Sequence, residues 1–148
     1  MEYKDIVKIL APCALNCRKC IAYSEGKIRK LSADLKDALG SFDRYAERFS
    51  VFLPVFKNYP QFKELLDFFT QADCIGCRNG GCKYPKCGVS QCYQTKEVDF
   101  CFQCEGFPCE KTNFDPDLKR RWIEMNKLMK EIGVEGYFEE TKNLPRYR

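Results

Sequence analysis

The chain has 148 residues, 45% of them hydrophobic, with 11 cysteines and no histidine. This size suits one domain, which we expect to span residues 1–148. The absence of histidine excludes Ser-His-Asp and Cys-His nucleophilic machinery, His-based zinc hydrolase sites and Cys₂His₂ fingers. The formal charge is +4 with every thiol neutral. Two Cys₄ zinc sites would each add two negative charges and cancel it, so the charge gives no support for nucleic-acid binding.

The cysteine content and the N-terminus together indicate a compartment. Charged residues run through the first ten positions, so the N-terminus lacks the apolar region of a secretory signal. No stretch approaches the roughly 20 apolar residues of a membrane span, so we expect no membrane association. We therefore place the chain in the cytoplasm, where closely spaced cysteines are metal ligands rather than disulfides. A secreted disulfide fold is the less favoured alternative, because an odd number of cysteines cannot all pair within one chain.

Residues 24–72 contain no cysteine and predict a helical body of three helices. Gly40 is placed to end the first helix and Ser41 to cap the second, while Pro54 ends the second and Pro60 begins the third. The apolar positions at helical spacing are Ile28, Leu31, Leu35 and Leu39, then Phe42, Tyr45, Phe49 and Phe52, then Phe62, Leu65, Leu66 and Phe69. We expect this body to supply most of the hydrophobic core, its aromatic residues included.

The last predicted helix spans residues 115–133. Asp115 is its expected N-cap, Pro116 its first residue and Gly133 its end. Its apolar stripe consists of Leu118, Trp122, Met125, Met129 and Ile132. The basic run from Lys119 to Arg121 fits a solvated helix face better than a binding patch. We expect the tail from Tyr137 to Arg148 to pack as an extended segment.

Between these helical parts, residues 74–109 contain eight cysteines and little helical periodicity. Two repeats have the pattern Cys-x₂-Cys-x₄-Cys, namely Cys74, Cys77 and Cys82, then Cys101, Cys104 and Cys109. A Cys-x₂-Cys turn brings two sulfurs to one tetrahedral ion, with Zn–S bonds of about 2.3 Å. Cys87 and Cys92 lie between the turns and are placed to complete their coordination. The sequence therefore predicts a mainly α fold with a cysteine-rich, irregular, metal-bound lobe of zinc-knuckle turns and little strand.

A separate cluster, Cys13, Cys17 and Cys20, offers three ligands with no fourth nearby. Its coordination position is either open, as in a cluster with a labile iron, or filled by a cysteine of the second half that folds back. The spacing matches the motif of radical SAM enzymes, but a chain of this length cannot build their barrel, so we treat the match as coincidental. The simplest partition of the other cysteines gives one site from Cys74, Cys77, Cys82 and Cys87 and another from Cys92, Cys101, Cys104 and Cys109. Interleaving of the two sets is the alternative.

Three segments together resemble a known family: Ala11 to Tyr23, Cys74 to Arg78, and Cys101 to Cys109. They are similar to a bacterial and archaeal family catalogued as domain of unknown function 3795, and the resemblance extends from Asp115 to Tyr147. One departure is Ala14, where the family pattern implies glycine. The resemblance implies a cysteine-rich, zinc-binding domain and no known activity.

Two classes of function remain open on the sequence. The first is a structural-zinc protein that acts as a binding or adaptor module, with two or three zinc ions and a protein partner rather than nucleic acid. The second is an iron–sulfur protein for electron transfer or redox sensing that uses the Cys13, Cys17 and Cys20 cluster. No Cys-x₂-Cys-x₂-Cys run typical of ferredoxins occurs, which favours zinc. No carboxylate pair stands out as acid and base, so the sequence does not indicate an enzyme.

Overall fold

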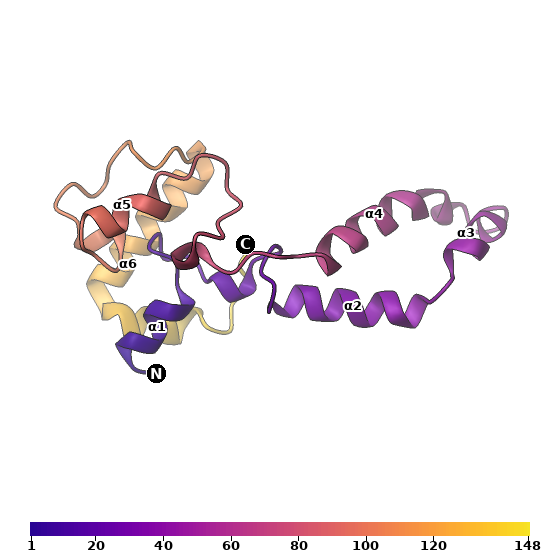
Figure 1. Cartoon of the computed structure of the whole chain (residues 1–148), viewed down its shortest axis with the longest axis horizontal. Helices are drawn as coiled ribbons and strands as arrows, with labels where there is room; N and C mark the ends of the chain where they lie inside the picture. Colours follow the sequence, from indigo (N-terminus) through magenta and orange to yellow (C-terminus); the bar gives the residue numbers. More distant parts are fainter.

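The computed structural model describes all 148 residues and is mainly helical, with almost no strand. The extended pairings are two isolated bridges, Leu10 with Asn16 and Tyr23 with Cys74. The chain forms a lobe from residues 1–26 and 71–148, and a helical arm from residues 27–70 that protrudes from it (Figure 1). The mainly helical class predicted from the sequence is confirmed. None of the helices combines the length and the apolar character that crossing a membrane requires.

The arm is an antiparallel pair of long helices, joined at its far end by a shorter helix and a 3₁₀ turn (Figure 1). Its helices are α2 (Lys27–Leu39), α3 (Asp43–Ser50) and α4 (Tyr59–Thr70), with a 3₁₀ turn over Pro54–Asn58. The Arg29 Nε–H donates to the carbonyl of Thr70 at 3.1 Å, and Lys36 pairs with Asp67 at 2.6 Å. These contacts join α2 to α4 side by side. Gly40 ends α2 and Pro60 lies in the first turn of α4, as predicted.

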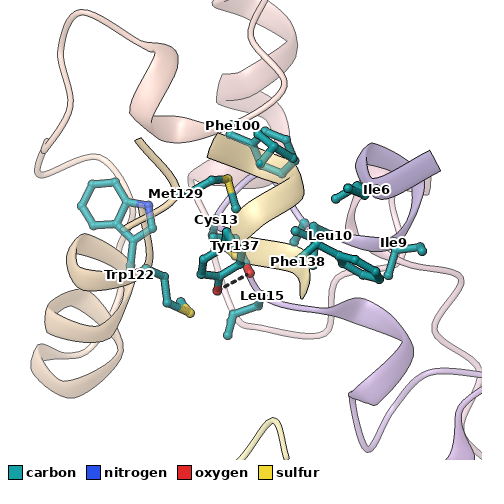
Figure 2. Packing of buried hydrophobic residues seen from close by; sticks show 14 of the residues in the cluster. Ile6, Ile9, Leu10, Cys13, Leu15, Phe100, Trp122, Met129, Tyr137 and Phe138 are labelled. Carbon is teal, nitrogen blue, oxygen red and sulfur yellow. Dashed lines mark hydrogen bonds between the residues drawn. The ribbon is translucent and has the colours of Figure 1, made fainter. Parts of the chain in front are cut away.

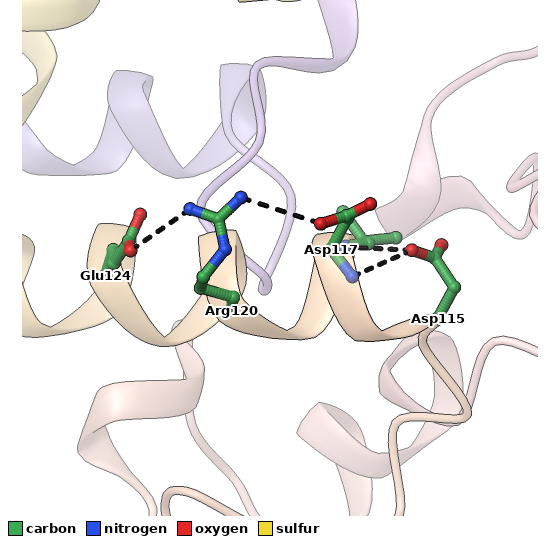
Figure 3. A network of polar contacts seen from close by, with 5 residues as sticks. Asp115, Asp117, Arg120 and Glu124 are labelled. Atoms are coloured by element: carbon green, nitrogen blue, oxygen red, sulfur yellow. Dashed lines mark hydrogen bonds and ion pairs between the residues drawn. The ribbon is translucent and has the colours of Figure 1, made fainter.

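The lobe contains the other helices, which are α1 (Tyr3–Ile9), α5 (Val89–Thr95) and α6 (Pro116–Thr141). Asp115 caps α6 as predicted, because its Oδ1 accepts the N–H groups of Asp117 at 3.1 Å and Leu118 at 3.0 Å. On the exposed face of the first turns, Arg120 pairs with both Asp117 and Glu124 (Figure 3).

The end of α6 differs from the prediction. Gly133 leaves helical geometry, with φ 79° and ψ 163°, but the chain resumes a helix that continues to Thr141. The prediction of an extended tail from Tyr137 onward is therefore wrong for its first part. Tyr137 and Phe138 are buried on this final helical piece, and the Tyr137 hydroxyl donates to the carbonyl of Ala14 at 3.1 Å. Packing of these two rings in the core stabilises the final helical piece, because most helical stability in proteins comes from such tertiary packing.

The hydrophobic core lies in the lobe, where α1 and the segment after it pack against α6 (Figure 2). Its members are Ile6, Ile9, Leu10, Ala11, Cys13, Ala14, Leu15, Val89, Phe100, Trp122, Met125, Met129, Val134, Tyr137 and Phe138. The prediction that the helical body of residues 24–72 supplies most of the core is wrong. The arm buries only Ser32, Ala46 and Leu66, since each of its long helices has only one long neighbour and covers one narrow stripe.

Candidate metal centres

The structure gathers all 11 cysteines, each a free thiol, around two cavities. The smaller cavity, of about 130 Å³, is lined by Cys92, Cys101, Cys104 and Cys109. The larger one, of about 760 Å³, is lined by Cys13, Cys17, Cys20, Cys74, Cys77, Cys82 and Cys87. Val89, at the start of α5, lines both cavities and lies between the two groups of sulfurs. We call them the four-cysteine and the seven-cysteine cavities.

The four-cysteine cavity is built by a short turn held against α6. Cys101 begins a 3₁₀ turn over Cys101–Gln103, and Cys104 follows it directly. The buried amide of Asn126, on α6, accepts the N–H of Phe102 at 3.1 Å and donates to the carbonyls of Cys13 at 3.3 Å and Trp122 at 3.0 Å. One side chain of α6 thereby holds the second Cys-x₂-Cys turn and the first cysteine of the chain.

The single tryptophan closes this cavity. The Trp122 ring is buried against Phe107, with centroids 4.9 Å apart and the rings nearly perpendicular. Its indole N–H is fully buried without a hydrogen-bond partner, and the thiol of Cys101 is close enough to be affected by it. Burial raises the pKa of Cys101 to about 12, and the nearby indole N–H of Trp122 opposes that shift. An unpartnered buried N–H beside a sulfur suits a thiolate, which is the form that binds a metal.

In the seven-cysteine cavity the thiols form a chain of contacts. Cys17 lies beside Cys77, Cys77 beside Cys82, and Cys82 beside Cys87. These neighbouring thiols lower the pKa of Cys17 and Cys82 and raise the pKa of Cys77 and Cys87. A cation that replaced protons along this row would meet sulfur neighbours that are already close.

The other thiols of this cavity are held by the backbone or by burial. The Cys74 thiol donates to the carbonyl of Gly81 at 2.7 Å, and its sulfur accepts the N–H of Gly76 at 3.4 Å. Burial raises the pKa of Cys74, and that of Cys13 to about 11. Gly76 has φ 99°, a conformation that favours glycine and aims its N–H at the sulfur.

The two cavities divide the cysteines into two sets. Cys92, Cys101, Cys104 and Cys109, which the local assignment places in one site, line one cavity. The Cys13, Cys17 and Cys20 cluster lines the same cavity as the other four cysteines, and Cys17 lies beside Cys77, as in the alternative in which a cysteine of the second half folds back. The contacts run in pairs, and no three cysteine, aspartate or glutamate side chains are arranged to hold one metal ion.

Arginine side chains that line the seven-cysteine cavity were not identified as site residues from the sequence. Arg120, Arg121, Arg146 and Arg148 all border it. Arg146 is half-buried, and its Nη1 donates to the carbonyl of Asn16 at 2.7 Å. Burial lowers the pKa of Arg146, but the nearby thiols of Cys20 and Cys13 raise it more, so the cation is favoured. The three basic residues of the run in α6 differ in their surroundings. Lys119 pairs with Glu110 and Arg120 with Glu124. Arg121 instead donates to the carbonyl of Arg146.

Comparison with known proteins identifies a family and nothing beyond it. The family model described as "Protein of unknown function (DUF3795)" matches residues 9–114, a stretch that includes every cysteine. The match ends before α6, so it does not include the expected extension from Asp115 to Tyr147. Searches of curated proteins and of solved structures gave no match. Because the match covers more than half of the chain, the protein belongs to the DUF3795 family.

Proposed function

We propose that the protein binds zinc through cysteine thiolates in two centres and serves as a small cytoplasmic binding or adaptor module for a protein partner. The observation that carries the proposal is the four-cysteine cavity, where four thiols line about 130 Å³ and the buried indole N–H of Trp122, beside Cys101, has no hydrogen-bond partner. Four thiolates are the ligand set of closed, tetrahedral structural zinc sites.

The four-cysteine centre would be structural. Cys92, Cys101, Cys104 and Cys109 would hold the ion, and the thiols would close around it by side-chain rotation, since metal binding completes the folding of such segments. Such an ion stabilises the segment and leaves no position for a substrate. The N–H of Trp122 would offset thiolate charge at Cys101, as partners in the surroundings of a metal commonly do.

The seven-cysteine centre has more ligands than one zinc ion takes. The row from Cys17 through Cys77 and Cys82 to Cys87 supplies four sulfurs, each beside the next in the row. Cys13, Cys20 and Cys74 would then remain as thiols beside the ion. Arginines at the rim, Arg146 foremost, would offset the negative charge of a site with four or more thiolates.

A second candidate function rests on the size of this same cavity. About 760 Å³ lined by seven sulfurs is more space than a single ion occupies, and it suits an iron–sulfur cluster held by cysteine thiolates. In that case the protein would take part in electron transfer or redox sensing. Visible absorbance separates the candidates, because zinc sites are colourless and iron–sulfur proteins are brown.

The single tryptophan makes the test specific for one centre. Protein purified without oxygen is analysed for zinc and iron, then stripped and titrated with Co²⁺, which accepts the same thiolate ligands and quenches nearby fluorescence through its d–d absorption. We expect at least two metal ions per chain, and quenching of Trp122 only while the four-cysteine centre fills.

Two matched variants assign the centres. Cys104→Ser should remove about one ion and abolish the fluorescence quenching, whereas Cys17→Ser should remove about one ion and leave the quenching intact. Less than one equivalent of total metal in the wild-type protein would refute the proposal. Equal loss of quenching in both variants would refute the division into two centres. Iron with sulfide in the wild-type protein would replace the zinc assignment of the larger centre by the second candidate.

A further inference from the structure

The helical arm exposes an unusual amount of apolar surface. Five large side chains on α2 and α4 each expose between 39% and 58% of their surface. They are Leu31, Leu35, Phe62, Leu65 and Phe68, which we call the apolar face. Contiguous exposed apolar patches on this scale mark interaction sites rather than ordinary surface.

The exposed residues of the two helices lie on the same side of the arm. On α2 the exposed Leu31 directly precedes the buried Ser32, and on α4 the exposed Leu65 directly precedes the buried Leu66. One residue corresponds to about 100° around a helix, so both leucines are rotated in the same sense from the packed stripe. The two helices are antiparallel, so a two-fold rotation about an axis perpendicular to their common plane relates one to the other. This rotation keeps each side of the plane on the same side, so leucines rotated equally from the packed stripe lie on one face of the pair. The apolar face is therefore continuous across α2 and α4.

The extent of this face matches what a stable dimer buries. A fully exposed phenylalanine side chain offers about 150–250 Å² and a leucine somewhat less, so the five residues offer roughly 400–500 Å². Interfaces are about 56–58% apolar, so a matching interface would bury roughly 700–900 Å² per copy. A standard interface buries about 800 Å² per partner. We infer that two copies of this chain associate through the apolar faces of their arms, which then form an antiparallel four-helix bundle.

The remaining exposed apolar residues of the arm and its base fit an antiparallel orientation. At the far end of the arm, Val51, Phe52 and Val55 are 83%, 62% and 67% exposed. Beyond the base of the arm, Ile75 is 54% exposed. An antiparallel pair places the far end of each arm against the base of the other, so both sets are covered. A parallel pair would instead bring the two far ends together and the two bases together.

The charge of the arm is compatible with self-association. Residues 27–70 hold eight basic and six acidic side chains of mixed order along the chain. Lys36 with Asp67 and Lys63 with Asp43 are already paired within one arm. Two copies therefore meet without a large like-charge repulsion.

The test is the mass of the full-length protein in solution. Light scattering coupled to size-exclusion chromatography, with protein at about 100 µM, should give twice the chain mass of 17.3 kDa. Leu65→Glu should raise the dimer dissociation constant at least about a hundredfold, because each interface would bury two unpaired carboxylates. The matched control, Lys30→Glu, adds negative charge at an exposed polar position of α2 and should remain dimeric.

Folding and association are separated by a second measurement. Leu65 is exposed in one copy, so Leu65→Glu should retain the helical circular dichroism of the wild-type protein. Leu31→Glu, on the other helix of the same face, should dissociate the dimer in the same way. A wild-type mass of one chain at this concentration would overturn the inference, as would Leu65→Glu and Leu31→Glu proteins that stay as dimeric as Lys30→Glu.

Discussion

One arginine side chain connects three segments of the lobe. The Nε–H of Arg78 donates to the carbonyl of Leu10 at 3.0 Å, and its Nη2 donates to the carbonyl of Asp99 at 2.6 Å. The guanidinium lies over the rings of Tyr93 and Phe100, at 5.2 and 5.3 Å from their centroids. Arg78 directly follows Cys77, so these contacts fix the first Cys-x₂-Cys turn between the N-terminal segment and the second turn.

We predict that Arg78→Ala lowers the free energy of unfolding by about 2–4 kcal/mol. The change removes two hydrogen bonds from a charged donor and two cation–π contacts, and it leaves two carbonyls with fewer partners. Arg78→Met keeps the stem between the two rings and should recover less than half of the loss. The measurement is urea unfolding followed by circular dichroism. The exposed Arg44→Ala serves as control and should stay within about 0.5 kcal/mol of wild type. An Arg78→Ala protein as stable as this control would show that the contacts contribute nothing net.

At the scale of elements, α6 depends on one glycine. Gly133 has φ 79° and ψ 163°, a region that is essentially restricted to glycine, and this break redirects the chain so that Tyr137 and Phe138 reach the core. A methyl group added at this position would meet no atom within 4 Å, so a substitution there is opposed by the backbone conformation alone.

We predict that Gly133→Ala destabilises the protein by about 1–3 kcal/mol, the cost of holding alanine in this conformation. Gly136, three residues later in the helical piece, is the matched control. There an added methyl group would meet Ile132 at 3.4 Å, an ordinary contact, and alanine favours a helix over glycine by about 1 kcal/mol. Thermal unfolding should therefore show a lower midpoint for Gly133→Ala and an equal or higher midpoint for Gly136→Ala. The same shift in both variants would contradict this explanation.

Local signals predicted several helix ends, although Ser41 does not cap α3, which begins after Phe42 and ends at Ser50 before Pro54. The location of the core could not be predicted from such signals. Gly40, Pro60 and Asp115 mark helix ends because capping involves only neighbouring residues. Apolar spacing on α2 and α4 predicts helices, but it does not say how many neighbours cover them. The arm has one long partner on each helix and keeps Leu31 and Leu65 exposed. The core formed instead where α1 meets α6, two helices at opposite ends of the chain.

At the scale of the whole molecule, the candidate site shows the same contrast between what neighbouring residues reveal and what depends on distant segments. The grouping of Cys92, Cys101, Cys104 and Cys109 was predictable because all four lie within one short stretch. A cysteine of the second half beside the N-terminal cluster was one expected alternative, but that Cys77 would lie beside Cys17 was not predictable, since it depends on how distant parts of the lobe fold together. The position of Arg146 beside the cysteines depends on the return of the chain after Gly133. Residues 130 positions apart, such as Asn16 and Arg146, carry no shared pattern in the sequence.

The cysteine-rich segment of residues 74–109 contributes little apolar burial of its own. Val89 and Phe100 are its members of the buried core, while α1 and α6 bury their own side chains against each other. Ordering the backbone costs about 1–2 kcal/mol per residue, which so small a buried surface cannot offset over a segment of this length. Thiolate coordination can supply about 10 kcal/mol or more for each structural zinc ion. The stability of this segment should therefore follow metal occupancy, whereas that of α2, α4 and α6 should not.

We predict that chelation under reducing, oxygen-free conditions speeds amide hydrogen exchange in residues 74–109, while α6 and the arm helices α2 and α4 keep most of their protection. The helices have their own hydrogen bonds and packing partners, so loss of the ions removes the constraint on the loops first. The measurement is hydrogen exchange followed by mass spectrometry of peptic peptides. Addition of excess Zn²⁺ should restore slow exchange in residues 74–109, which controls for damage by the chelator. Unchanged exchange in that segment after complete metal removal would show that side-chain packing alone holds the two cysteine groups in place.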